Sequence, residues 1–151
     1  MRFTAWRRDW ICSPMAGGEG ASAEWLAGID GYDLVLLDLP LGMVPVIPCR
    51  RLLVVNADAN CHVRLHRHPW AADERLLVTQ FSSQRTLQQG LLDLWLAGGL
   101  PLLNLHLHRD EAMAEAMAAK LPVGRYAPTS LVAHELAALA TWCLAEGEAP
   151  R

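Results

Sequence analysis

The sequence predicts an α/β fold, a doubly wound and mostly parallel sheet with helices on both faces. Two observations support this prediction. Short, continuous apolar runs, typical of strands buried on both faces, alternate along the chain with segments whose apolar residues recur at helical spacing. The chain has 151 residues, 52% of them hydrophobic and 19% charged, which suits one globular domain with a sizeable core.

The expected strands are short and rich in leucine and valine. They comprise residues 33–37, 52–55, 76–79 and 102–107. Between the first two strands, the prolines and the glycine of residues 39–50 exclude a long regular element. In the last strand, leucines alternate with Asn104, His106 and His108, which indicates that one face is less buried, as near a sheet edge.

The expected helices follow from apolar spacing and from their end signals. They comprise residues 23–29, 58–68, 86–97, 111–120 and 130–146. Gly98 and Gly99 end the third of these helices, and Asp110 is placed to cap the fourth. Residues 1–22 show no clear periodicity, and their proline and glycines are typical of loops.

Asp38 is the strongest single candidate for a functional residue. It directly follows the first expected strand and precedes a proline and a glycine, so it lies at the strand tip, where α/β folds bind ligands. In P-loop nucleotidases such an aspartate sits near Mg²⁺ and the attacking water. Taken alone the pattern is weak, and a strand-terminal turn residue is the alternative interpretation.

The phosphate-binding loop that should precede such an aspartate is absent from the chain. That loop reads G-x-x-x-x-G-K-[ST], and its amides and lysine hold the phosphates. Before residue 28 the only glycines are Gly17, Gly18 and Gly20, and no lysine occurs before Lys120. The sequence therefore has the pattern of a nucleotidase that lacks the third of the domain that binds the phosphates.

The histidines allow a metal site as an alternative. His62 and His66 have the i, i+4 spacing that places two ligands on one helix face, with His68 nearby, and His106 and His108 share one face of a strand. No third ligand at a familiar spacing accompanies them, so surface or hydrogen-bonded histidines are the preferred interpretation. A serine hydrolase is disfavoured because the chain has no G-x-S-x-G elbow.

Charge and composition limit the partners and the compartment. The net charge of −3 argues against nucleic acid as a partner, and no run of 18 apolar residues predicts a membrane span. The four cysteines show no C-x-x-C spacing, which is typical of reduced thiols in a cytoplasmic protein. Among the six tryptophans, Trp6, Trp10 and Trp70 lie in irregular stretches and are candidates for a partner surface.

Two strings resemble one family closely. Asn56-Ala-Asp-Ala-Asn-Cys-His62 and His108-Arg-Asp-Glu-Ala-Met-Ala-Glu115 are similar to the BcsQ family of cellulose-biosynthesis ATPases, within the MinD/ParA group of deviant Walker A ATPases. The stretch 139–144 adds to the resemblance. On this basis residues 32–151 are expected to be the C-terminal part of a MinD/ParA-like ATPase domain, and residues 1–31 a poorly matched N-terminal segment.

The resemblance implies an ATP and Mg²⁺ site at the strand tips. Asp38 then corresponds to the Walker B or switch II aspartate, acting on Mg²⁺ through bound water, and Gly42 belongs to switch II. Thr79 stands where the family often has an asparagine that reads adenine, and Pro122 and Val123 stand where a loop packs near the base. The implied partners are other Bcs subunits of the cellulose secretion complex and a second copy in a homodimer, at the cytoplasmic face of the inner membrane.

The departure from the family lies in the missing loop, K-G-G-x-G-K-[ST]-T, and the strand before it. In this class of fold that strand lies between the strands expected at 33–37 and 52–55, and an unfilled slot leaves costly unpaired backbone groups. We therefore expect a truncated chain that cannot hydrolyse ATP alone and is marginal or rearranged unless residues 1–30 or a partner fill the slot. The sequence leaves open whether such a chain binds the ATP and Mg²⁺ that the resemblance implies. The alternatives are an ATPase completed by a separate N-terminal fragment and a nucleotide-free α/β interaction module.

Overall fold

A computed structural model describes residues 2–6, 10–14, 34–39 and 49–147 of the chain, with side chains for 34–39 and 49–145. The chain divides into two compact units, one of Met1–Cys49 with Trp142–Arg151 and one of Arg50–Thr141. The second unit has a parallel sheet with helices, which confirms the predicted α/β class. The helix expected over 23–29 and most of the stretch 39–50 lie outside the described residues.

The sheet of the second unit has three parallel strands in the order β4-β5-β6. Its strands are β4 (Arg51–Asn56), β5 (Glu74–Phe81) and β6 (Leu102–His108). β5 is the middle strand, and its residues Leu76, Leu77 and Val78 are almost completely buried, as expected for a strand covered on both faces. The pairing of β5 with β6 has register shifts, one of them between Leu76 and Val78.

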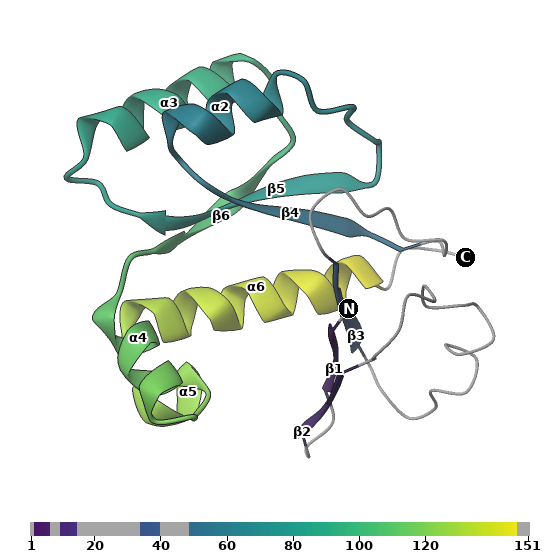
Figure 1. The fold of residues 1–151 in the computed structure, drawn as a ribbon, viewed down its shortest axis with the longest axis vertical. Helices are drawn as coiled ribbons and strands as arrows, with labels where there is room; N and C mark the ends of the chain where they lie inside the picture. The colour runs from purple at the N-terminus through teal and green to yellow at the C-terminus, as the bar shows by residue number, and fades with distance from the viewer. Residues whose placement is uncertain (1, 7–9, 15–33, 40–48, 148–151) are drawn as a thin grey trace. The chain divides into compact units, whose positions relative to one another are not determined.

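Helices α2 (Ala59–Leu65) and α3 (Thr86–Ala97) lie side by side over one face of this sheet (Figure 1). Trp95 on α3 is 2% exposed and is the largest fully buried side chain of the core between these helices and the sheet. The other buried members of this core are Val55, Ala57, Leu65, Leu76, Val78, Phe81 and Leu91. The indole Nε1 of Trp95 donates a 3.0 Å hydrogen bond to His62 Nδ1, so the polar atom of this buried ring is satisfied.

A second, smaller core joins the helices that follow β6. These are α4 (Glu111–Ala118), α5 (Val123–Tyr126) and α6 (Leu131–Gly147). Ala116, Val123 and Val132, one from each helix, form the buried cluster. Asp110 fixes the arrangement, because it caps α4 through Ala112 N at 2.9 Å and also accepts from Val132 N at 3.3 Å.

The first unit contains an antiparallel sheet in the order β2-β1-β3. Its strands are β1 (Arg2–Trp6), β2 (Trp10–Pro14) and β3 (Leu34–Asp38). Two predictions are corrected here. Residues 2–6 and 10–14, expected to be loop, form paired antiparallel strands, and β3 pairs with β1 instead of joining the parallel sheet. β1 supplies hydrogen-bond partners for the backbone groups along one side of β3. An antiparallel neighbour satisfies these groups as a parallel one would.

Candidate functional site

The carboxyl ends of β4, β5 and β6 meet at one edge of the parallel sheet, where α/β folds bind ligands. At this edge Asn56, the last residue of β4, is in register with Thr79 of β5. The Thr79 hydroxyl lies 3.1 Å from Asn56 Oδ1 and 3.3 Å from the Val55 carbonyl oxygen. Its single hydrogen is therefore used within the sheet, and only its lone pairs are free to accept from a ligand.

The backbone beside Thr79 has an unusual conformation. Gln80 has a φ of 51°, in the left-handed region that non-glycine residues rarely occupy. It is exposed, whereas Phe81 beyond it is buried and its carbonyl accepts from Arg109 N at 2.9 Å. The end of β5 is thus held by the segment that follows β6.

Asp58, just beyond β4, acts as a helix cap. Its carboxylate accepts a 2.7 Å hydrogen bond from Cys61 N, and its own amide donates to the Asn56 carbonyl at 2.9 Å. Burial, together with the negative charge of Asp58, raises the pKa of the Cys61 thiol. The thiol is therefore held in its unreactive protonated form, which disfavours a nucleophilic role for Cys61.

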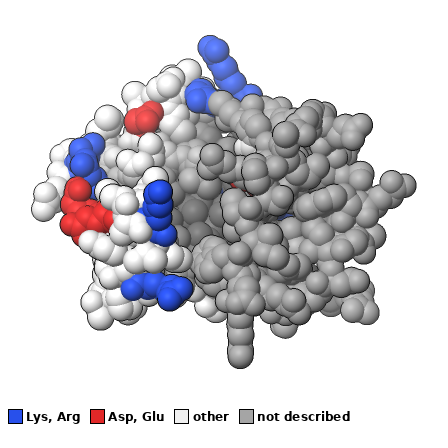
Figure 2. Space-filling view, turned by 60° about the horizontal axis from the view of Figure 1, so that its bottom comes forward, with Lys and Arg blue, Asp and Glu red and all other residues white. Residues whose placement is uncertain are grey.

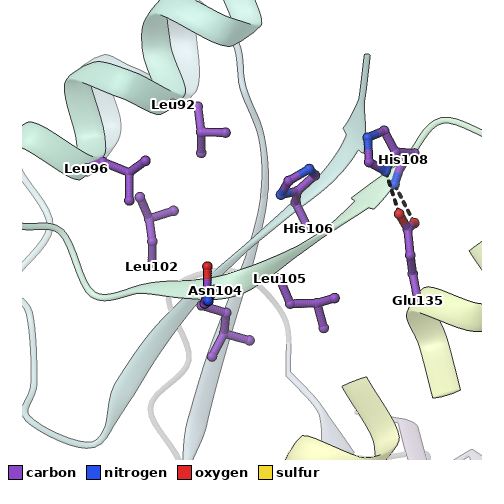
Figure 3. A pocket seen from close by; sticks show the side chains of 9 residues that line it. Leu92, Leu96, Leu102, Asn104, Leu105, His106, His108 and Glu135 are labelled. Atoms are coloured by element: carbon purple, nitrogen blue, oxygen red, sulfur yellow. Dashed lines mark hydrogen bonds and ion pairs between the residues drawn. The ribbon is translucent and has the colours of Figure 1, made fainter. Parts of the chain in front are cut away.

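The most tightly connected polar cluster lies at the end of β6. His108 N donates to Glu135 Oε2 at 2.8 Å, and His108 Nδ1 lies 2.5 Å from Glu135 Oε1 (Figure 3). The Glu135 side chain is only 12% exposed, so one nearly buried carboxylate joins β6 to α6. The Phe81 ring meets the rings of His106 and His108 edge to face, and burial, aided by His108, lowers the pKa of His106.

Sequence reasoning did not identify Glu135. It lies among the alanines and leucines of α6, and its partner His108 is 27 residues away, so no local spacing links the two. The only available signal is an acidic residue on a helix face that is otherwise apolar, next to a strand that ends in histidines.

The predicted nucleotide-site residues fall into both units. Asp38 is exposed at the end of β3 in the first unit, in register with Arg2. Thr79, Pro122 and Val123 belong to the second unit, where Pro122 precedes α5 and Val123 is buried in the small core. Gly42 lies outside the described residues.

The histidines considered as metal ligands make other contacts. His62 accepts from Trp95, and its ring meets that of His66 edge to face with centroids 4.6 Å apart. His68 Nε2 lies 2.8 Å from Glu74 Oε2. Within the described part of the chain, no group of three or more His, Cys, Asp or Glu residues is arranged to hold a metal ion.

Of the tryptophans considered for a partner surface, Trp70 is half-buried and packs against the main core and the His68 ring. Trp6 and Trp10 are opposite each other in the register of the β1–β2 pair.

On the face shown in Figure 2, acidic and basic side chains of the described residues are scattered among uncharged ones. Among the helices the structure describes, none has the length and apolar character needed to cross a membrane.

Comparisons with known proteins point to one family. The family model of the cellulose biosynthesis protein BcsQ matches residues 17–144. The cellulose biosynthesis protein BcsQ of Salmonella typhi is 38% identical over 145 residues, which cover 92% of this chain and 58% of that protein. The proteins of the same name from Salmonella typhimurium strain LT2 and Escherichia coli K12 are each 40% identical, over 85% and 75% of this chain and 54% and 48% of theirs. The chain thus spans about half the length of these curated relatives.

Proposed function

This chain belongs to the family of the cellulose biosynthesis protein BcsQ, and from that membership we propose that it acts in bacterial cellulose biosynthesis. The observation that carries the proposal is a similarity that extends over most of the chain, through the strands and helices of the second unit. A fold class alone would not indicate a process, since α/β sheets serve many functions.

We further propose that these 151 residues do not hydrolyse ATP by themselves. Transfer of a phosphoryl group needs preorganised positive charge and backbone amides around the β- and γ-phosphates. The sole lysine of the chain, Lys120, is exposed after α4, in a left-handed turn with a φ of 55°. These 151 residues contain no phosphate loop to hold a triphosphate.

The residues expected near adenine support the same proposal. The Thr79 hydroxyl is engaged within the sheet, and the side chain of Val123 fills the small core. Neither supplies the pair of donor and acceptor groups with which an asparagine reads an adenine edge. Under this proposal the chain acts by binding other proteins of the cellulose machinery, at the cytoplasmic side of the inner membrane.

One observation supports a second candidate function. Asp38 is exposed at a strand end, the position in which a switch aspartate acts on Mg²⁺-bound water. If a separate fragment supplies the phosphate loop, the assembled protein is an ATPase and Asp38 is essential to it.

Genetic complementation distinguishes the two candidate functions. We expect deletion of the gene in its host to lower cellulose output, measured by dye binding, and this chain to restore it. Under the first candidate the Asp38→Ala variant restores output as well as the parent does, whereas under the second it does not. Equal steady-state levels of the two proteins, checked by immunoblot, are the control, and unchanged cellulose after deletion would refute a role in the process altogether.

A further inference from the structure

Among the residues that the structure describes, no strand uses the backbone groups on the outer edge of β6. Within the described residues, β6 pairs with β5 on one side and with no strand on the other. The His108 amide points outward, to Glu135, while the Pro101 carbonyl and the Arg109 amide point inward to β5. The register of β6 against β5 shifts between Leu76 and Val78, but β6 itself stays a strand from Leu102 to His108. Because the backbone groups of a strand alternate between its two edges, we infer that Asn104 and His106, two and four residues before His108, direct theirs outward as well.

A hollow of about 400 Å³ follows this edge. It is lined by residues from both faces of β6, and Figure 3 shows His106 and Leu105 on opposite sides of the strand. Leu92 and Leu96 of α3 form one wall, and Leu96 is 58% exposed. Since consecutive residues of β6, from Leu102 to His106, line the hollow, it fits another strand laid along β6 better than it fits a compact ligand.

The edge also lacks the protection that sheet edges usually have. Natural edge strands carry lysines, other charges or prolines that prevent pairing with another chain. Residues 102–107 contain no charged residue apart from the weakly basic His106, and no proline. Only the last residue is shielded, because Glu135 occupies the His108 amide.

The order of side chains in β6 identifies the strand that fits. We propose that the edge of β6 binds the β6 edge of a second copy of this chain, antiparallel about a two-fold axis at Leu105. In that register Leu103 is opposite Leu107 of the second copy, and Asn104 is opposite its His106, so that apolar residues meet apolar ones and amide meets imidazole.

The register also uses the free backbone groups. Asn104 and His106, whose groups point outward, become the hydrogen-bonded pair, while Leu105 forms the closer, non-hydrogen-bonded pair with its own copy. A two-fold axis normal to the sheet keeps both copies of α3 on the same face, which brings the exposed Leu96 side chains toward each other. The result is one continuous sheet of six strands, formed without nucleotide.

The first test removes the outward amide. On this assignment the Asn104→Pro variant loses a donor that points away from β5, so the fold should persist while association weakens roughly tenfold to a hundredfold. Sedimentation velocity over a concentration series, without nucleotide, measures this, and circular dichroism checks that the variant melts like the parent. Asn104→Thr keeps the amide and is the matched control that should still associate. A parent chain that stays monomeric throughout would overturn the proposal.

The second test does not depend on the behaviour of a proline variant. In the proposed register the two Leu105 Cα atoms are about 4.5 Å apart, within the span of a disulfide. The Leu105→Cys variant should therefore form a covalent dimer on mild oxidation, beyond any formed by the parent with its own cysteines. Asn104→Cys, displaced from the axis, is the control that should not. A dimer in sedimentation without the Leu105→Cys cross-link would assign the contact to another surface and refute this one.

Discussion

Glu135 is the residue whose contacts most clearly hold two elements of the second unit together. Its nearly buried carboxylate meets both the amide and the imidazole of His108. We expect Glu135→Ala to lower the free energy of unfolding by about 1–3 kcal/mol, because a partly buried amide and ring nitrogen lose their partner. Urea denaturation followed by circular dichroism measures this loss.

The Glu135→Gln variant is the matched control. An amide oxygen still accepts from the His108 backbone, so this variant should lose less stability than Glu135→Ala. In a double-mutant cycle, removing His108 should make the two losses non-additive, since the residues act through one contact. Additive losses, or a parent-like Glu135→Ala, would mean that the contact contributes nothing.

The lowered pKa of His106 leads to a prediction of how the stability of the chain depends on pH. Burial, with the charge of His108, lowers the pKa of His106 below its ordinary 6.5, so the unfolded chain takes up a proton more readily than the folded one. The contribution of neutral His106 to stability is therefore complete above the pKa that His106 has in the unfolded chain. This contribution is lost as the pH falls toward the lower pKa that His106 has in the folded chain. The free energy of unfolding of the His106→Gln variant should depend less on pH than that of the parent between about pH 7 and pH 5. Parallel profiles for the two proteins would contradict this.

Residues whose roles depend on local sequence could be anticipated. Asp110 was expected to cap the helix that follows it, and it does so. Its second bond, to Val132, and the pair of His108 with Glu135 could not be anticipated, because they join residues 22 and 27 positions apart. The nucleotide-site roles of Asp38 and Thr79 stay predictions.

At the scale of elements, helix α3 shows that apolar residues at helical spacing are not all buried. Apolar residues at helical spacing predicted this helix, yet two of them differ in burial, since Leu91 is 8% exposed and Leu94 52%. We therefore expect Leu91→Ala to lower the free energy of unfolding by about 2–4 kcal/mol and Leu94→Ala by less than about 1 kcal/mol. The two variants delete the same atoms from one helix, so each controls for helix propensity in the other. Equal losses in urea denaturation would show that Leu94 is buried in solution.

The regular elements of the second unit follow the sequence closely. Strands expected at 52–55, 76–79 and 102–107 lie at Arg51–Asn56, Glu74–Phe81 and Leu102–His108, and the helix expected at 86–97 has those bounds. Each has an apolar run or period strong enough to identify it alone. The pair of β1 and β2 has no such pattern, because its strands depend on pairing with each other and with β3.

At the scale of the whole molecule, the sequence indicated a central strand missing beside the expected strand 52–55. The structure has β4 hydrogen-bonded to β5, and within the described residues no strand pairs with its other edge. β3, expected on the far side of that slot, pairs with β1 in the first unit. The strand partners of β3 could not be predicted, because they come from a segment whose own pattern indicated a loop.

The absence of a phosphate loop from these residues predicts that nucleotide does not stabilise the chain. A ligand present at a hundred times its dissociation constant adds about 2.7 kcal/mol to the free energy of unfolding, which would raise the melting temperature by several degrees. We expect a thermal melt followed by circular dichroism to be unchanged by millimolar Mg²⁺-ATP, with Mg²⁺-AMP and Mg²⁺ alone as matched controls. An upward shift with ATP alone would mean that the triphosphate is bound without the loop, and would favour the ATPase candidate. In that event the shift should disappear in Asp38→Ala, because the aspartate contacts, through bound water, the metal that the phosphates share.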